Sequence, residues 1–193
     1  MLKLHIGSGG LWMPGWVHID KAWALAPKGI EFIHHDLSQG IPFGDGTVDL
    51  IYGSHMLDHF SVETGAIPLL KECYRVMKAG AVARFAVMNV DKIVRAYQRH
   101  DMERFDYCQP AFYRQTKSQG LRLGVFLAGS LSGHREYTGH WWTTDFVGFE
   151  ELARAAGFET IAEVQAGESA SIAMQMDVED TYEDHSLYVE VTK

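Results

Sequence analysis

The 193-residue sequence has only two cysteines, Cys73 and Cys108, which are too few for a disulfide framework or a four-cysteine zinc site. No apolar run approaches the roughly 18 residues that a membrane helix needs. The first residues reach Gly7 too soon for the apolar stretch of a signal peptide. The sequence also lacks internal repeats and low-complexity tracts. These absences favour a cytoplasmic globular protein and argue against fibrous, secreted and membrane classes.

The length suits one domain over residues 1–193 with a hydrophobic core of its own. We expect a monomer or a weak homodimer. The formal net charge of −8 makes the protein a poor candidate for binding nucleic acid, because neutralising phosphates needs clustered lysine and arginine.

The charges are unevenly distributed along the chain. Residues 92–140 carry 8 basic and 4 acidic side chains, whereas residues 141–193 carry 2 basic and 12 acidic ones. The basic middle either binds a small anionic ligand or pairs with the acidic C-terminal third. The acidic run at residues 177–184 lacks the spacing of a calcium loop and is expected to be a solvated hairpin loop. Besides Lys92, the basic side chains of the middle region are Arg95, Arg99, Arg104, Arg114, Lys117, Arg122 and Arg135.

Short apolar runs that end in polar or glycine-rich turns predict parallel strands at residues 2–6, 16–19, 30–34, 48–52 and 82–87. Residues 160–164 and 187–191 are expected to form a final antiparallel pair. Apolar spacing predicts an amphipathic helix over residues 63–78, with Pro68 in its first turn and Gly80 as its left-handed cap. A second helix should begin at Asp145 and stop at Gly157. Residues 92–143 follow no clear pattern and are predicted to be an irregular lid or insertion.

Ligands of open α/β sheets bind outside the carboxyl ends of the strands, so the residues that end the first four strands should meet. Glycines at 7, 9 and 10 let backbone amides approach a ligand closely. A carboxylate at Asp20 can accept both hydroxyls of a ribose, and Asp36 can accept from an adenine amino group. Only ten residues separate the first two strands, which leaves no room for a pyrophosphate-binding helix. A nucleoside with a short polar tail therefore fits better than a dinucleotide.

These residues carry a family resemblance over about residues 2–90. LHIGSG at 4–9, PGWVHID at 14–20, HDL at 35–37 and IPF at 41–43 occur in this order, followed by VDLIYGSHMLDH at 48–59 and LKECYRVMKAG at 70–80. The sequence resembles class I S-adenosylmethionine-dependent methyltransferases, and more closely the small methyltransferase-11-like proteins. The resemblance implies an α/β, Rossmann-like fold with a mostly parallel seven-stranded sheet, an antiparallel last strand and helices on both faces.

The same resemblance implies S-adenosylmethionine as the cofactor and a set of residues that hold it. Gly7, Ser8 and Gly9 would lie beside its methionine part and Asp20 at the ribose. Asp36 and Leu37 would contact the adenine, while Ser54 and His55 would face the amino acid end. The implied activity is methyl transfer to a small-molecule or glycan-type acceptor, with an anionic acceptor as a hypothesis. The alternative is a non-catalytic regulator or scaffold that binds the cofactor without transferring its methyl group.

No catalytic base can be assigned from the sequence. If the acceptor is a hydroxyl, His59, His134 or His140 are candidates to remove its proton, although plain packing also explains His59. The segment from His55 to His59 resembles a zinc-binding histidine pair, but its position suggests no third ligand. We expect no metal site.

Overall fold

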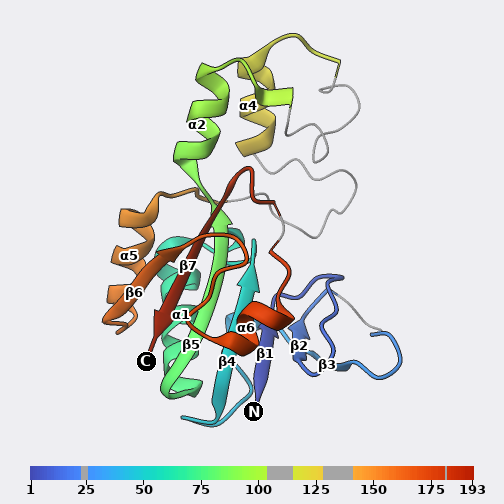
Figure 1. Cartoon of the computed structure of the whole chain (residues 1–193), viewed down its shortest axis with the longest axis vertical. Helices are drawn as coiled ribbons and strands as arrows, with labels where there is room; N and C mark the ends of the chain where they lie inside the picture. The colour runs from blue at the N-terminus through green and yellow to red at the C-terminus, as the bar shows by residue number, and fades with distance from the viewer. Residues whose placement is uncertain (23–25, 104–114, 128–140, 181) are drawn as a thin grey trace.

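The computed structural model describes residues 1–22, 26–103, 115–127, 141–180 and 182–193. A seven-stranded sheet with the strand order β3-β2-β1-β4-β5-β7-β6 forms its centre (Figure 1). Strands β1 to β5 are parallel, and β7 runs antiparallel to both of its neighbours. The predicted fold class is therefore confirmed. The strands are β1 (Lys3–Ile6), β2 (Val17–Asp20), β3 (Glu31–His34), β4 (Val48–Ser54), β5 (Met77–Met88), β6 (Thr160–Val164) and β7 (Ser186–Thr192).

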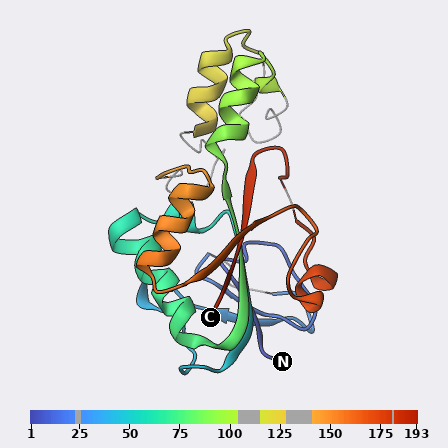
Figure 2. The same cartoon turned by 60° about the vertical axis from the view of Figure 1, so that its left-hand side comes forward.

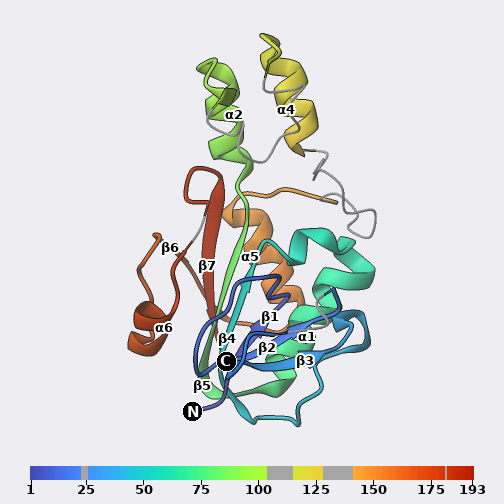
Figure 3. The ribbon, with the colours of Figure 1, turned by 90° about the vertical axis from the view of Figure 1, so that its right-hand side faces the viewer.

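Helices lie on both faces of the sheet, as predicted. α1 (Ile67–Val76) and α5 (Phe146–Ala155) cover one face, and α6 (Ile172–Asp177) lies on the other (Figures 2 and 3). The main core fills the space beneath α1 and α5, where Ile51, Leu70 and Phe149 are fully buried. Since side chains alternate along a strand, the residues between these core positions face α6.

The helix predicted over residues 63–78 is present with different ends. A π-helical turn, η3 (Val62–Ala66), leads into α1, and Pro68 lies in the first turn of α1 as predicted. The prediction that Gly80 caps this helix is wrong. The helix ends at Val76 because Met77 takes an extended conformation and pairs with Val48 of β4. Gly80, with a φ of 77°, lies instead within β5, where its N–H donates to the Lys193 carbonyl at 2.7 Å.

The region expected to be irregular contains two helices among its described residues. α2 (Val90–Gln98) and α4 (Gln119–Leu127) stand beyond the carboxyl ends of β4 and β5 (Figures 1 and 2). They share a small core with Met88 at the end of β5 and Met102. Asn89 begins α2, since its side chain accepts hydrogen bonds from the amides of the next turn. The boundaries of the region, and its role as a lid, stay predictions.

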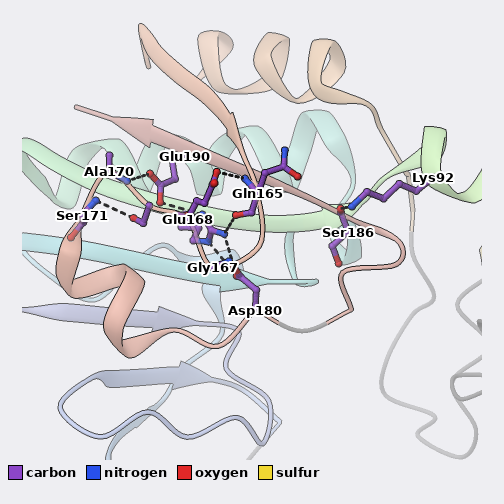
Figure 4. Close-up of polar contacts among 11 residues, drawn as sticks. Lys92, Gln165, Gly167, Glu168, Ala170, Ser171, Asp180, Ser186 and Glu190 are labelled. Atoms are coloured by element: carbon purple, nitrogen blue, oxygen red, sulfur yellow. Dashed lines mark hydrogen bonds and ion pairs between the residues drawn. The ribbon is translucent and has the colours of Figure 1, made fainter.

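The chain between β6 and β7 crosses the α6 face of the sheet. We call its described residues, 165–180 and 182–185, the strap. Arg84 of β5 is 1% exposed and binds the strap near its start and again at Asp180. Figure 4 shows the strap residues Gln165, Glu168 and Asp180 near Glu190 of β7. The Arg84 guanidinium donates to the carbonyls of Gln165 (3.0 Å) and Glu168 (2.5 Å) and to the carboxylate of Asp180. Glu190 of β7 lies 3.3 Å from the same guanidinium. These charged groups form the Arg84 cluster.

The acidic run is only partly the solvated loop that its composition predicted, since Glu179, Glu183 and Asp184 are exposed but Asp180 is not. The side chain of Asp180 is only 3% exposed because it supplies a counter-charge to Arg84. Asp177 pairs with Lys3 at 2.6 Å and accepts a hydrogen bond from the Trp16 indole at 3.2 Å. The sequence feature that could have predicted the burial of Asp180 is an arginine in the middle of a buried strand, because such a charge needs acidic partners from elsewhere in the chain.

We predict that Arg84→Met lowers the free energy of unfolding by about 3–5 kcal/mol, because it leaves the carboxylates of Asp180 and Glu190 buried without their cation. Urea denaturation measures the loss. Arg154→Met is the matched control, since it removes an arginine whose pair with Glu150 (2.7 Å) is solvent-exposed and should cost at most about 0.5 kcal/mol. Equal losses in the two variants would contradict the structural role of the cluster.

Candidate functional site

The carboxyl ends of β1 and β2 are joined by hydrogen bonds through the glycine loop that follows β1. The Gly7 amide donates to the Ile19 carbonyl at 2.8 Å, and the Gly9 amide donates to Asp20 Oδ2 at 2.8 Å. Asp20 Oδ1 accepts a second hydrogen bond, from the backbone amide of Ala22, at 2.7 Å. Of the predicted site residues, Gly7, Gly9 and Asp20 are thus brought together, with Ser8 between them.

The glycines of this loop are required by its conformation. Gly7 and Gly9 have φ values of 60° and 52°, in the left-handed region that side chains disfavour. A Cβ on Gly7 would also lie 2.6 Å from the Cβ of Met56, whereas a Cβ on Gly9 would meet open space. Met56 therefore packs over Gly7 from the end of β4. Sequence reasoning missed Met56, since only the parallel pairing of β1 with β4 places it there.

Asp36 and Leu37 follow β3 and have different environments. Asp36 caps the short turn η1 (Leu37–Gln39), where its Oδ1 accepts from the Ser38 amide at 3.0 Å. That hydrogen bond lowers the pKa of Asp36, and Lys21, 3.5 Å from Oδ2, contributes in the same direction. Leu37 is buried in the main core. The His35 amide donates to the Asp20 carbonyl at 3.1 Å, which ties this turn to the end of β2.

Ser54 and His55 end β4 on the side of β5 and β7. Ser54 is half-buried and is paired with Ala86 of β5. His55 has a φ of 47°, unusual for a residue other than glycine, and its amide donates to the Ala86 carbonyl at 2.8 Å. Its ring packs against the rings of Tyr182 and His185 at centroid distances of 5.3 Å. The ring of His55 therefore contacts the strap, while the neighbouring Met56 covers the glycine loop.

Polar contacts hold His55 from two elements. His55 Nε2 lies 2.7 Å from Ser186 Oγ, and the Ser186 hydroxyl donates to the Tyr182 carbonyl at 2.7 Å. Asp58 Oδ2, in the turn η2 (Leu57–His59), lies 3.9 Å from His55 Nδ1. Burial raises the pKa of Asp58 to about 6 even though the nearby His59 opposes the shift. Sequence reasoning missed Ser186 and Tyr182, which lie more than 120 residues from His55 in the chain.

Of the three histidines predicted as candidate bases, the structure describes only His59. His59 is half-buried in η2, and its amide donates to the Met56 carbonyl at 3.2 Å. His134 and His140 lie outside the described residues, so they stay predictions. Within the ranges that the structure describes, no three histidine, cysteine, aspartate or glutamate side chains are grouped as a metal site would require.

Two buried histidines lie beneath the glycine loop on the α6 face. His5 of β1 is paired with His18 of β2, and the centroids of their rings are 5.2 Å apart. The Met13 amide donates to His18 Nε2 at 2.9 Å, which fastens the β1–β2 connection to the sheet. Burial, together with the neighbouring His18, lowers the pKa of His5 from its ordinary value of 6.5 to about 3. Burial also lowers the pKa of His18. Both rings are thus held in the neutral form.

An open cleft of about 360 Å³ lies at the opposite end of the sheet. Asp49, Lys78 and Ser171 are among its lining residues, at the amino ends of β4, β5 and α6. None of the predicted site residues lines it. The carboxyl ends of β1, β2 and β4 remain the candidate site. Among the described residues, no helix is long and apolar enough to span a bilayer.

Comparisons with known proteins agree with this geometry. Residues 16–85 match a family model described as a methyltransferase domain. A SAM-dependent methyltransferase of Thermotoga maritima, named as a possible histamine N-methyltransferase, is 14% identical with a TM-score of 0.58, and the match covers 100% of this chain and 82% of that one. A SAM-dependent methyltransferase of Archaeoglobus fulgidus is 12% identical with a TM-score of 0.57, covering 99% and 85%.

A third solved structure is the human N-acetylserotonin methyltransferase in complex with SAM. It is 15% identical with a TM-score of 0.54, and the match covers 100% of this chain and 47% of that one. The search of curated proteins finds no match. At these identities the solved structures establish a shared fold.

We predict that Gly7→Ala destabilises the protein by about 2–4 kcal/mol, the sum of left-handed strain and the contact with Met56. Gly46→Ala is the control, because Gly46 has a φ of 63° and open space around a new Cβ. It should cost only the strain, about 1–2 kcal/mol. Urea denaturation compares the two variants. If the two losses are the same, Met56 does not restrict the loop.

We predict that acid destabilises the protein through His5. The unfolded chain takes up this proton near pH 6.5 and the folded chain only near pH 3, so the contribution is complete above pH 6.5 and is lost as the pH falls. Between pH 7 and pH 5 the loss is about 2 kcal/mol. Unfolding free energies at both pH values measure it. His5→Gln should shrink the difference, whereas His34→Gln, at an exposed position, should leave it unchanged; an undiminished difference in His5→Gln would exclude His5 as its source.

Proposed function

We propose that the chain is a class I S-adenosylmethionine-dependent methyltransferase, because residues 16–85 match a methyltransferase-domain model and the fold is shared with such enzymes, and that it methylates a small anionic acceptor. The acceptor binds between the carboxyl ends of β4 and β5 and the helices α2 and α4. The observation that carries the proposal is the position of the Asp20 carboxylate beside the glycine loop, with exposed basic side chains on and next to the helices beyond the sheet.

The residues at the end of β2 fit a ribose. A carboxylate has about four acceptor positions, and Asp20 uses one on each oxygen for the amides of Gly9 and Ala22. One position on each oxygen is left for the two ribose hydroxyls. These two hydrogen bonds also fix the orientation of the carboxylate before the cofactor binds, which reduces the entropy cost of binding.

The glycine loop fits the part of the cofactor next to the ribose. Space is open above Gly9, so a ligand can approach its backbone. Ser8 Oγ is buried and has no hydrogen-bond partner among the described residues, so it offers a donor to a bound ligand. Asp36 remains partly exposed at the end of β3, where it would accept from the adenine amino group. When bound, S-adenosylmethionine supplies an electrophilic methyl group on a sulfonium.

This chain's main contribution to the chemistry would be alignment. Asp20 and the glycine loop would fix the cofactor at the carboxyl ends of β1 and β2, and α2 and α4 would fix the acceptor above β4 and β5. Holding two reactants close together in the orientation that the reaction needs can lower the activation barrier by several kcal/mol. Covering the site with α2 and α4 would also exclude water, which strengthens the electrostatic contacts made there.

An anionic acceptor is favoured by the basic residues of the middle region. Arg95 on α2, Arg99 directly after it and Lys117 before α4 are exposed. Among the residues that the structure describes, no ion pair joins these three to the acidic C-terminal third. At these positions the alternative, in which the basic middle pairs with the acidic C-terminal third, therefore loses support. Arg122, by contrast, is buried near Glu103. Two of the similar structures are named for small acceptors, histamine and N-acetylserotonin, which supports a small molecule.

We predict micromolar binding of S-adenosylmethionine and S-adenosylhomocysteine by calorimetry, weakened at least about tenfold in Asp20→Ala because hydrogen bonds to a charged group are lost. Asp45→Ala, which changes an exposed carboxylate paired with Arg75, is the control and should bind normally. Methyl transfer is then measured on matched pairs of phosphorylated and unphosphorylated phenols, amines and sugars. The phosphorylated members should react faster.

The outcomes separate the two halves of the proposal. A folded wild type that binds neither cofactor form would refute the assignment of the glycine loop and Asp20. Binding of the cofactor without preference for the phosphorylated acceptors would leave the cofactor site intact and refute the anionic acceptor. Binding without transfer to any member of the panel would favour the regulator or scaffold.

A further inference from the structure

The connection between β1 and β2 is attached to the sheet at two points by side chains of β2. Asp20 Oδ2 accepts from the Gly9 amide at 2.8 Å, and His18 Nε2 accepts from the Met13 amide at 2.9 Å. Asp20 and His18 are two residues apart on one strand, so their side chains lie on the same face of the sheet. The chain from Gly9 to Met13 is therefore held between a carboxylate and an imidazole.

The hydrogen bond between His18 and Met13 has a defined direction. Among the described residues, the Met13 amide has no acceptor besides His18 Nε2, whereas the Met13 carbonyl already accepts from the Trp16 amide at 3.2 Å. His18 Nε2 lies 3.2 Å from that carbonyl, farther than from the Met13 amide. Because a ring N–H at Nε2 would face the Met13 N–H, Nε2 carries a lone pair and the ring hydrogen is on Nδ1.

Packing alone does not explain a histidine at this position. The side chain of His18 is fully buried, and its Nδ1 has no hydrogen-bond partner among the described residues. An apolar side chain would fill the same place without leaving a buried polar atom unpaired. The contact that an apolar side chain cannot make is the hydrogen bond to Met13.

Aromatic rings enclose His18 on both sides. The ring of Trp12 packs against it at a centroid distance of 5.3 Å and against Phe32 of β3 at 5.7 Å. On the other side lies His5 of β1, whose ring is 5.1 Å from that of Tyr52 of β4. The ring of His18 is therefore fixed in place, and it points Nε2 at the connection.

The titratable groups on the elements around His18 supply no cation that would hold Met13 in its place. The two carboxylates among them are engaged, Asp20 with backbone amides and Asp177 with Lys3 at 2.6 Å. These groups are His5 and Lys3 on β1, Asp20 on β2, His34 on β3, Tyr52 on β4 and Asp177 on α6.

A second proton on His18 would remove the acceptor. Nε2 would then be a donor facing the Met13 N–H, and its only acceptor there would be the Met13 carbonyl. The Met13 amide would lose its partner, so the connection would have to shift. Burial lowers the pKa of His18 from its ordinary value of 6.5, which keeps the ring neutral and the attachment intact at neutral pH.

The glycine loop depends on the attachment of Met13. The Leu11 amide donates to the Ser8 carbonyl at 3.0 Å, which ties the second half of the connection to the first. Ser8 and Gly9 are the residues that the proposed cofactor would approach. Without the bond to His18, the chain beyond Gly9 would be attached to β2 only through Asp20.

We propose that His18 is a positioning residue of the cofactor site: its Nε2 lone pair holds Met13 and thereby keeps Ser8 and Gly9 in the conformation that binds S-adenosylmethionine. The inference rests on the proposed function. His18 acts from beneath the loop, because its fully buried side chain leaves no surface for a ligand. Asp20 holds the first half of the connection and His18 the second.

Calorimetry with S-adenosylhomocysteine at neutral pH compares two variants of His18 in the full-length protein. His18→Leu should weaken binding by about tenfold, because the Met13 amide loses its acceptor. His18→Gln should bind like the wild type, because its side-chain oxygen can accept in place of Nε2. Val189→Ala creates a cavity in the core on the opposite face of the sheet. It controls for lost stability and should not change the Kd.

The pH dependence of the same Kd separates the lone pair from the shape of the ring. As the pH falls below 6.5, the wild type should bind S-adenosylhomocysteine more weakly, by up to about tenfold per pH unit once His18 takes up its proton. His18→Gln has no titrating group at this position and should lose this dependence. His34→Gln, at an exposed position of β3, should keep it. Circular dichroism restricts the comparison to pH values at which each protein is folded.

Two measurements on the unliganded protein test the attachment without the cofactor. Ring-nitrogen NMR, with His18 assigned from the spectrum of His18→Gln, should place the ring hydrogen on Nδ1. Hydrogen exchange at the Met13 amide should be slow in the wild type and in His18→Gln, and faster in His18→Leu, since only the first two retain an acceptor.

The contrary results distinguish this inference from the proposed function. A ring hydrogen on Nε2, or equal exchange of the Met13 amide in His18→Leu and the wild type, would overturn the inference whether or not the cofactor binds. Unchanged affinity in His18→Leu, equal losses in His18→Leu and His18→Gln, or an acid dependence that persists in His18→Gln would overturn it as well. A wild type with the expected NMR and exchange results that binds neither cofactor form would instead refute the proposed function.

Discussion

A short connection between β1 and β2 is the constraint on which much of this structure depends. Parallel strands are normally joined by a crossover long enough to lay a helix over the sheet, but only ten residues run from Gly7 to Trp16. The face above β1, β2 and β4 must then be covered by another part of the chain. The strap provides that cover, since Met174 of α6 packs on Met13, Trp16 and Tyr52. Arg84 fastens the strap to β5 through buried charges, so a hydrophobic cover depends on an ionic cluster for its position.

The same segment connects the cover of the sheet to the site. Because β7 is antiparallel to β5, its first residue, Ser186, lies beside Met88 at the carboxyl end of β5. The strap must therefore end at the edge where the site is formed. Arg84 binds Asp180 in the strap, and Ser186 follows six residues later at this edge.

Much of the fold could be predicted from the sequence, because strand ends and helix starts are encoded locally. Short apolar runs located all seven strands to within a few residues, apart from β5, whose pairing with β4 begins five residues earlier at Met77. Asp145 and Gly157 marked α5, since a capping carboxylate and a left-handed glycine act on their own neighbours. Gly80 was misread because sheet pairing, a long-range effect, ended the helix first. Helices α2 and α4 were missed because their few apolar positions form a small core with Met88 and Met102, which are not their neighbours in a simple helical pattern.

In the candidate site, too, the residues that local sequence signals place could be predicted, whereas those placed by long-range packing could not. Gly7, Gly9 and Asp20 could be predicted because each follows a strand of its own, and parallel order brings strand ends together. Met56 and Ser186 could not be predicted in this way, because their roles come from side chains that meet across strands. For Ser186 the antiparallel last strand contained part of the answer, since it requires the residues before β7 to reach the carboxyl edge. What no pattern supplies is the direction of a ring. The orientation of the His55 ring involves a left-handed backbone conformation and a contact with Ser186 Oγ, 131 residues away in the chain.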